Sequence, residues 1–166
     1  METIGDLLSR HPFFEGLKPE YLALIAGCGQ NVHFDPSAYL LREGETADRF
    51  FAIRGGSVAV ETYVPSRGPV TLQTLGEGEI LGWSWLFPPY VWQFDARARE
   101  VVRATAFDGA CLRTKCDADP ALGYELIETA GTPGFQSAGG YQAPTPRRVW
   151  SRPDQIARHS CRARSA

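Results

Sequence analysis

The side chains best suited to bind a ligand occur together in the middle of the chain, in the run GWSWLFPPYVW, which is Gly82–Trp92. Aromatic rings offer flat apolar surfaces to planar or apolar molecules, and a serine hydroxyl at the start of a short helix can donate to an anion. Two interpretations stay open. The aromatic side chains line a pocket for a planar or apolar ligand, or they fill that space as part of the core. The residues concerned are Trp83, Ser84, Trp85, Tyr90 and Trp92.

The rest of the sequence offers little catalytic or metal-binding chemistry. Its three histidines, His11, His33 and His159, lie far apart and form no His-x-His pair. The sequence contains no P-loop, no His-Glu-x-x-His motif and no Ser-His-Asp order. Its carboxylates crowd predicted turns, where solvated side chains are the ordinary explanation. We therefore expect no enzymatic activity, no metal and no cofactor.

The four cysteines are scattered along the chain and include no C-x-x-C pair; they are Cys28, Cys111, Cys116 and Cys161. Zinc sites and disulfide frameworks usually show closer, paired spacing. We expect all four to be reduced structural thiols. The first residues lack the basic and apolar regions of a signal peptide, and no apolar run approaches about 18–20 residues. A cytoplasmic protein without membrane association is the expectation.

The elements that must position the ligand-binding run begin with a set of strands and turns over Leu40–Val60. Gly44 is suited to a turn because glycine adopts a positive φ at little cost. Apolar residues then alternate on either side of Gly55-Gly56, which predicts two half-buried strands joined by a two-residue hairpin. The alternating apolar residues are Phe51, Ile53, Val58 and Val60.

Further elements follow from apolar periodicity and turn residues. Patterns with helical spacing predict short helices at 4–10, 19–28 and 119–128. Period-two patterning from about residue 30 to 113 predicts a small antiparallel barrel or jelly roll. Within it, Asp108-Gly109 predicts a type I′ turn between a strand that ends at Phe107 and a strand over 110–113.

Several of these motifs resemble the cyclic-nucleotide-binding domain family, which includes transcription regulators of the Crp/Fnr type. The similarity rests on Arg-Glu-Gly-Glu-x-Ala-Asp starting at Arg42, on the glycine turn after Ile53, and on the helical lead-in His-Pro-Phe-Phe-x-Gly-Leu starting at His11. A Gly-x-Gly-x-x-x-Gly pattern from Gly76 to Gly82 adds to it. The resemblance covers about residues 4–128. It implies a mainly β fold, an antiparallel jelly-roll β-barrel (a double-stranded β-helix) with short flanking α-helices.

The resemblance also implies a phosphate-binding cassette that begins at Gly82. In the family a glutamate follows this glycine and binds the ribose, and a later arginine neutralises the cyclic phosphate. Here Trp83 stands at the glutamate position and Ala98 at the arginine position, flanked by Arg97 and Arg99. Strand alternation points both arginines to the face opposite Ala98, and a shift of one residue would make either a phosphate ligand. An indole is only a donor and cannot replace a carboxylate acceptor. We expect a degenerate cassette that disfavours cyclic nucleotides, with ligand-binding candidates Gly82, Trp83, Ser84, Trp85, Arg97 and Arg99.

Charge divides the chain into two unequal parts. Residues 1–128 hold eleven basic and eighteen acidic residues, a net charge of −7, whereas residues 129–166 hold six arginines and one aspartate, a net charge of +5. The second part is rich in proline and glycine and has almost no periodicity, which predicts a disordered basic tail. A native tail or a shifted reading frame would both explain it.

These observations together predict a non-enzymatic regulatory or sensor module that binds a small ligand or a protein partner. The alternative is a Crp/Fnr-type transcription regulator whose DNA-binding domain is truncated or supplied by a partner. The tail contains no helix-turn-helix pattern, so we expect no sequence-specific DNA binding from this chain by itself. Because the helix at 119–128 is short, we expect a monomer or a weak dimer.

Overall fold

The computed structural model describes residues 3–130 of the 166-residue chain. Its strands form two four-stranded antiparallel sheets. The first sheet has the order β1-β8-β3-β6, comprising β1 (Gly29–Phe34), β8 (Val102–Asp108), β3 (Arg49–Gly55) and β6 (Ile80–Leu81). The second has the order β2-β7-β4-β5, comprising β2 (Tyr39–Leu41), β7 (Asp95–Ala98), β4 (Val58–Val64) and β5 (Gly68–Leu75).

The two sheets make a β sandwich of jelly-roll type. The mainly β, antiparallel prediction is confirmed, but the prediction of a closed barrel is wrong. The turn at Gly55-Gly56 explains part of the difference. It joins β3 to β4, which lie in different sheets, so it is not a hairpin. Gly56 has a φ of 86°, and a Cβ there would lie 2.3 Å from the carbonyl oxygen of Val101. This crossing between the sheets therefore requires glycine.

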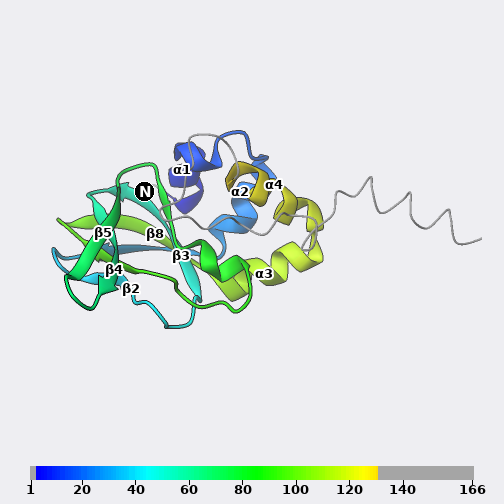
Figure 1. Ribbon diagram of the computed structural model, residues 1–166. Coiled ribbons are helices and arrows are strands. Elements are labelled where there is room, and N and C mark those ends of the chain that lie inside the picture. Colours follow the sequence, from blue (N-terminus) through cyan, green and yellow to red (C-terminus); the bar gives the residue numbers. More distant parts are fainter. Residues whose placement is uncertain (1–2, 131–166) are drawn as a thin grey trace, which may run out of the picture.

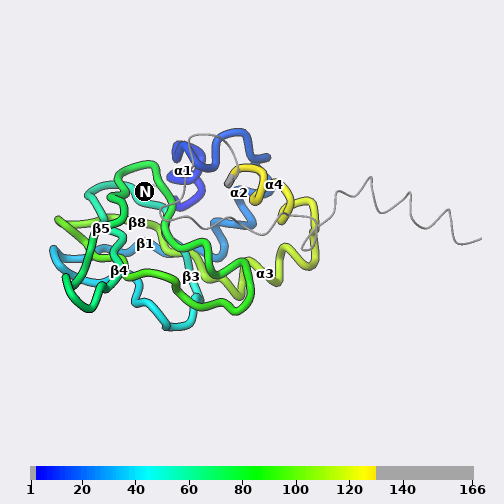
Figure 2. The backbone as a smooth tube through the Cα atoms, in the orientation of Figure 1, coloured from blue at the N-terminus to red at the C-terminus, as the bar shows by residue number. Residues whose placement is uncertain are grey.

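Helices gather on the outer side of the first sheet, as Figure 1 shows. They are α1 (Ile4–Ser9), the 3₁₀ turn η1 (Pro12–Phe14), α2 (Pro19–Ala26), α3 (Gly109–Ala118) and α4 (Pro120–Ala130). In Figure 2 the N-terminal helices, in blue, lie beside the yellow α4. An ion pair of 3.4 Å between Lys18 and Glu125 joins these two ends of the described chain.

The helix α3 was not expected. The predicted turn at Asp108-Gly109 and the predicted strand over 110–113 are wrong, because Asp108 caps a helix instead. Its carboxylate accepts a hydrogen bond of 2.6 Å from the backbone N–H of Cys111. An aspartate followed by glycine suits either a turn or a helix start when it is judged locally. The tertiary fold excludes the hairpin, because β8 already pairs with β1 on one side and β3 on the other and leaves no edge for a further strand.

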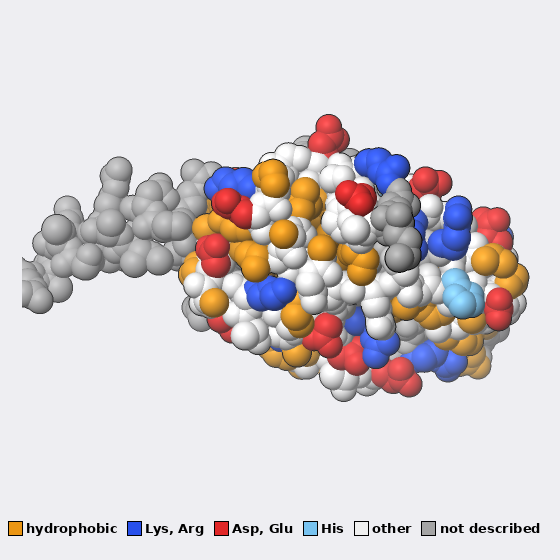
Figure 3. Space-filling view, turned by 180° about the vertical axis from the view of Figure 1, so that it is seen from behind, with side chains coloured by type: hydrophobic (Ala, Val, Ile, Leu, Met, Phe, Trp, Pro, Cys, Tyr) orange, Lys and Arg blue, Asp and Glu red, His pale blue; other side chains and the backbone are white. Residues whose placement is uncertain are grey.

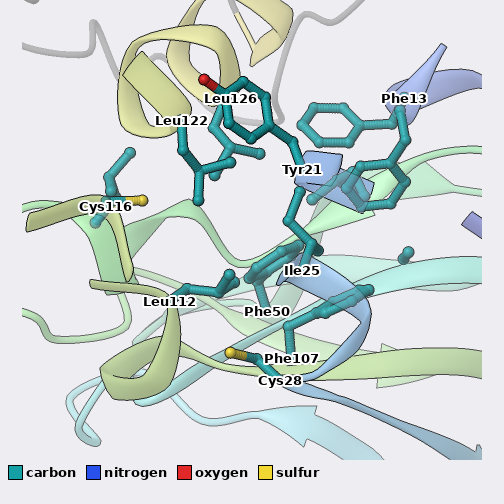
Figure 4. Packing of buried hydrophobic residues seen from close by; sticks show 14 of the residues in the cluster. Phe13, Tyr21, Ile25, Cys28, Phe50, Phe107, Leu112, Cys116, Leu122 and Leu126 are labelled. Atoms are coloured by element: carbon teal, nitrogen blue, oxygen red, sulfur yellow. The ribbon is translucent and has the colours of Figure 1, made fainter. Parts of the chain in front are cut away.

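Two hydrophobic cores share strand β3. Phe51 and Ile53 point between the sheets, whereas Phe50 and Ala52 point toward the helices. Figure 4 shows the second core, in which Phe50 and Phe107 lie beneath side chains from α2, α3 and α4. The expectation that β3 is half-buried is therefore wrong, since both of its faces are covered.

A disulfide joins Cys28, just before β1, to Cys111 in the first turn of α3. This contradicts the expectation that all four cysteines are reduced. The two cysteines are 83 residues apart in sequence, so their pairing depends on α3 folding against β1 and cannot be read from spacing. Cys116 is free and buried, and burial raises the pKa of its thiol to about 12.

Two absences apply to the described residues only. None of the helices in this part of the chain has the length and apolarity needed to cross a membrane. No group of three or more histidine, cysteine, aspartate or glutamate side chains within residues 3–130 is placed to hold a metal ion. Residues 131–166, which make up most of the predicted basic tail, lie outside the described residues.

Candidate functional site

A small cavity of about 80 Å³ lies between the two sheets where β6 leads into the 3₁₀ turn η2 (Trp83–Leu86). Most of its lining is apolar, and the polar side chains that reach it are uncharged except for one carboxylate. The lining residues are Leu41, Val60, Leu75, Ile80, Leu81, Gly82, Trp83, Ser84, Trp92, Gln93, Phe94, Asp95 and Ala96. The candidates Gly82, Trp83 and Ser84 therefore border one cavity.

Gly82 sets the direction in which the chain enters η2. Its φ of 97° lies in the left-handed region, which side chains other than glycine rarely adopt. A Cβ at this position would lie 3.1 Å from the ring of Trp92 and 3.4 Å from the carbonyl oxygen of Arg49. Gly82 is thus needed both for its backbone conformation and for the close approach of the Trp92 ring.

The aromatic residues of the run divide between cavity and core. Trp85 is only 1% exposed and stacks on Phe50 with ring centroids 5.2 Å apart. It belongs to the core between the first sheet and the helices and does not line the cavity. Trp83 is half-buried and lines the cavity, and its ring also packs against Phe13 at 5.4 Å. The two interpretations of the sequence therefore each describe some of these side chains.

Tyr90 and Trp92 are held by a backbone pairing with the turn at Gly44–Ala47. Gly44 has the positive φ expected from the sequence, at 85°. Its N–H donates to the Trp92 carbonyl at 2.9 Å, and the N–H of Ala47 donates to the Tyr90 carbonyl at 2.7 Å. This pairing fixes the end of the run and places the Trp92 ring in the wall of the cavity.

Arg97 and Arg99 do not reach the cavity. Along β7 the side chains of Ala96 and Ala98 are buried, and Arg97 points to the opposite face. Its Nη2 donates to Glu61 Oε1 at 2.8 Å, and this hydrogen bond is the main cause that raises the pKa of Arg97. Arg99 is exposed just beyond β7. Strand alternation had indicated this opposite-face arrangement, because side chains at i and i+2 share a face.

Asp95 is the carboxylate at the cavity, and its charge is already compensated. Its Oδ1 accepts a hydrogen bond of 2.8 Å from the backbone N–H of Glu43 and lies 3.5 Å from Nε of Arg42. Arg42 also lies over the ring of Tyr39, 4.1 Å from its centroid. The Asp95 carboxylate is therefore already engaged by Arg42 and the Glu43 N–H and supplies no positive charge for an anionic ligand.

Arg113 is a positioning residue that sequence reasoning missed. It lies on α3, and its Nη1 donates to the carbonyl oxygen of Trp85 at 2.5 Å. Its guanidinium also lies over the ring of Tyr90, 4.7 Å from the centroid. The sequence analysis placed this residue in a strand. The helix cap at Asp108 was the signal that could have placed Arg113 on a helix facing η2.

Comparison with known proteins gives a family match over this region. The sequence model of the cyclic nucleotide-binding domain matches residues 31–119. Among curated proteins, the chain is 26% identical over 124 residues to the CRP-like cAMP-activated global transcriptional regulator of Mycobacterium tuberculosis. That alignment includes 75% of this chain and 55% of the regulator, so the chain spans about half of the regulator's length.

Solved structures extend this similarity to the fold. A candidate cyclic nucleotide-binding protein from Geobacter metallireducens is 28% identical with a TM-score of 0.69, covering 78% of this chain and 92% of that protein. The N-terminal domain of a Streptomyces coelicolor transcriptional regulator is 24% identical with a TM-score of 0.64, covering 75% and 87%. The regulatory subunit of a cAMP-independent protein kinase A from Trypanosoma brucei is 20% identical with a TM-score of 0.64, covering 78% and 46%. The last two show a shared fold.

Proposed function

This chain belongs to the cyclic-nucleotide-binding domain family, and we propose that it is a non-enzymatic sensor module whose cavity binds a small apolar or planar ligand in place of a cyclic nucleotide. Modules of this family are regulatory. The observation that carries the proposal is the charge of the cavity. Among its described lining residues there is one carboxylate and no lysine or arginine.

A cyclic phosphate is an anion and needs charge-assisted hydrogen bonds in a partly buried site. The resemblance assigns Ala98 to the family's arginine position and Trp83 to the position that binds the ribose. Arg97 is turned away from the cavity and donates to Glu61. Hydrogen bonds to charged groups contribute about 1.5–3 kcal/mol each, so the loss of both should weaken nucleotide binding by several kcal/mol.

The size of the cavity supports a small ligand. Pockets for drug-sized molecules measure roughly 300–1,000 Å³, whereas this cavity is about 80 Å³. A ligand of a few heavy atoms would fit the cavity as it stands, and a larger one would have to displace the half-buried ring of Trp83. Ser84 supplies a hydroxyl at the edge for orientation.

Calorimetric titration tests the proposal with cyclic AMP, cyclic GMP and benzene as probes. We expect no binding of either nucleotide at micromolar concentrations and saturable binding of benzene. The variant Ala96→Leu, which fills the cavity, should abolish benzene binding, whereas Arg97→Gln lies outside the cavity and should not. Micromolar cyclic nucleotide binding that disappears in Arg97→Ala or Arg99→Ala would restore a nucleotide-sensor function instead.

A second candidate is a Crp/Fnr-type transcription regulator whose DNA-binding domain is truncated or supplied by a partner. The 26% identity to the mycobacterial regulator, of which the chain spans 55%, favours it. On the face in Figure 3, acidic and basic side chains of the described residues are interspersed, and this face shows no broad area of positive charge. A gel-shift assay of the full chain together with a partner that carries a DNA-binding domain separates the two candidates, because only the second predicts sequence-specific retardation of that complex.

A further inference from the structure

A second cleft, of about 430 Å³, opens where the N-terminal helix meets the first sheet. Its walls come from α1 and the turn after it, the end of β3, the start of β8 and the loop between β5 and β6. The charged and titratable residues that line it are Arg10, His11, Arg54, Glu77 and Arg103. It shares no lining residue with the cavity beside Trp83, so the two are separate sites.

Two arginines lie side by side in this cleft. Arg54 is on β3 and Arg103 is on the neighbouring strand β8. The guanidinium of Arg103 lies against Gly55, because a Cβ built there would be 3.0 Å from its Nη2. Among the residues that the structure describes, no aspartate or glutamate forms an ion pair with either arginine. Neither positive charge is therefore compensated by an ion pair among the described residues.

The donors of Arg54 are also poorly satisfied. Its Nε is buried and has no hydrogen-bond partner, and its Nη2 makes one long hydrogen bond of 3.4 Å to the carbonyl oxygen of Ala104. Burial, followed by the positive charge of Arg103, lowers the pKa of Arg54. A buried donor without an acceptor costs free energy, as does an unpaired charge. An anion between the two guanidinium groups would compensate both.

His11 adds neither charge nor a free donor to the cleft. Its Nδ1 accepts from the N–H of Phe13 at 3.3 Å, so the proton is on Nε2, which donates to the carbonyl oxygen of Ile53 at 3.2 Å. Burial lowers the pKa of His11 and keeps the ring neutral near pH 7. The remaining charges are three arginines and the single carboxylate of Glu77.

We propose that this cleft binds a divalent oxyanion, a phosphate or sulfate group, through Arg54 and Arg103. Arg54 and Arg103 together carry two positive charges against the single carboxylate in the lining, Glu77. Planar guanidinium groups match phosphate oxygens in a bidentate fashion. A volume of about 430 Å³ leaves room for a small molecule that carries the phosphoryl group. The site does not depend on what fills the cavity beside Trp83.

Isothermal titration of the full chain with inorganic phosphate at pH 7.5 and constant ionic strength tests the proposal. Sulfate and acetate form the comparison arms. We expect saturable binding of phosphate and sulfate and at least tenfold weaker binding of acetate. Arg103→Gln and Arg54→Gln should each weaken phosphate binding by about tenfold or more. Arg67→Gln is the matched control, because it removes the same charge from an exposed arginine in the turn between β4 and β5.

Glu77→Gln should change the affinity for phosphate in the opposite direction. It removes the one carboxylate of the cleft and should tighten phosphate binding several-fold, which a purely structural role for these residues would not produce. Should Arg54→Gln fail to fold, as judged by circular dichroism, Arg103→Gln decides, because Arg103 is exposed. The proposal is overturned if the wild-type chain shows no saturable phosphate binding, or if Arg67→Gln weakens it as much as Arg103→Gln.

Discussion

Single residues at this site have roles that follow from their contacts rather than from their types. Trp83 and Trp85 are two positions apart and both stack on Phe50, yet only Trp83 also lines the cavity. Arg113 holds the carbonyl oxygen of Trp85 from a helix more than twenty residues downstream. The cavity wall therefore depends on residues outside the run Gly82–Trp92.

Gly82→Ala tests how strongly one residue determines the cavity. The added Cβ would meet the Trp92 ring at 3.1 Å, on a backbone with a φ of 97°. We expect the free energy of unfolding to fall by about 1–3 kcal/mol. Urea denaturation measures it, with Gly76→Ala as the control, since there the nearest atom to an added Cβ is 3.9 Å away. Equal losses in the two variants would contradict the role assigned to Gly82.

His11 makes the free energy of unfolding depend on pH, and the burial of its ring determines the sign of that dependence. Because its pKa is lowered from 6.5, the folded state binds a proton less readily than the unfolded chain. The contribution of neutral His11 to the free energy of unfolding is fully present above pH 6.5. It is lost as the pH falls from there through the lower pKa of the folded state. The loss should reach at most about 1.4 kcal/mol per pH unit for this one group.

Urea denaturation between about pH 8 and pH 5 measures this dependence. His11→Asn keeps an acceptor for the N–H of Phe13 and should flatten the profile, whereas His33→Asn, at an exposed histidine, should leave it unchanged. A profile in His11→Asn as steep as that of the wild-type chain would show that other groups cause it.

At the scale of elements, β3 and α3 make the contacts that connect the β sandwich to the helices and to η2. Strand β3 contributes Phe50 to one core and Phe51 to the other, so it couples the sandwich to the helices. Helix α3 is tied at three points, through the cap at Asp108, the disulfide from Cys111 and the contact from Arg113 to η2. The position of the cavity wall is thus linked to the position of α3.

The disulfide gives a prediction about α3. Cys28→Ser should lower the free energy of unfolding by about 2–4 kcal/mol. The bond joins residues 83 positions apart, and without it the unfolded chain regains the conformational entropy that this loop closure removes. Alkylation in denaturant without reductant, followed by mass spectrometry, should leave Cys28 and Cys111 unlabelled, and reduction should expose both. Labelling of these two cysteines without reductant would show that the bond does not form.

For the whole molecule, the apolar side chains that stay exposed determine whether copies of the chain associate. The apolar stripe of α4 is buried within the chain, where Leu122 and Leu126 are at most 2% exposed in the core that includes Tyr21. Among residues 3–130, the large hydrophobic side chains that remain exposed are scattered over several segments: Leu24, Tyr39, Tyr63, Leu72 and Val101. Single exposed apolar residues do not make an interface.

We therefore predict a monomer or a weak dimer. Light scattering after size exclusion should give a mass near 18.3 kDa at micromolar concentration. Leu72→Ser should leave that mass unchanged, since an isolated exposed leucine does not hold subunits together. A tight dimer at micromolar concentration would show that residues other than those described here, or a face not recognised as apolar, mediate pairing.

The sequence by itself determined the local features of this protein. Strand alternation predicted that Arg97 lies opposite Ala98, and the turn predicted at Gly44 has the expected positive φ. The motifs from Arg42 and from Gly76 carried the family resemblance that the family match confirms. Such features depend on a few residues that are neighbours in sequence, so they can be predicted from the amino-acid sequence.

The tertiary structure decided everything that depends on partners distant in sequence. Only the fold could place β3 and β4 in different sheets, pair Cys28 with Cys111 and send the chain into α3 after Asp108. The same holds for the division between cavity and core among the tryptophans. Burial and pairing depend on which segments pack together, and local residue patterns leave several packings with the same alternation and the same turns.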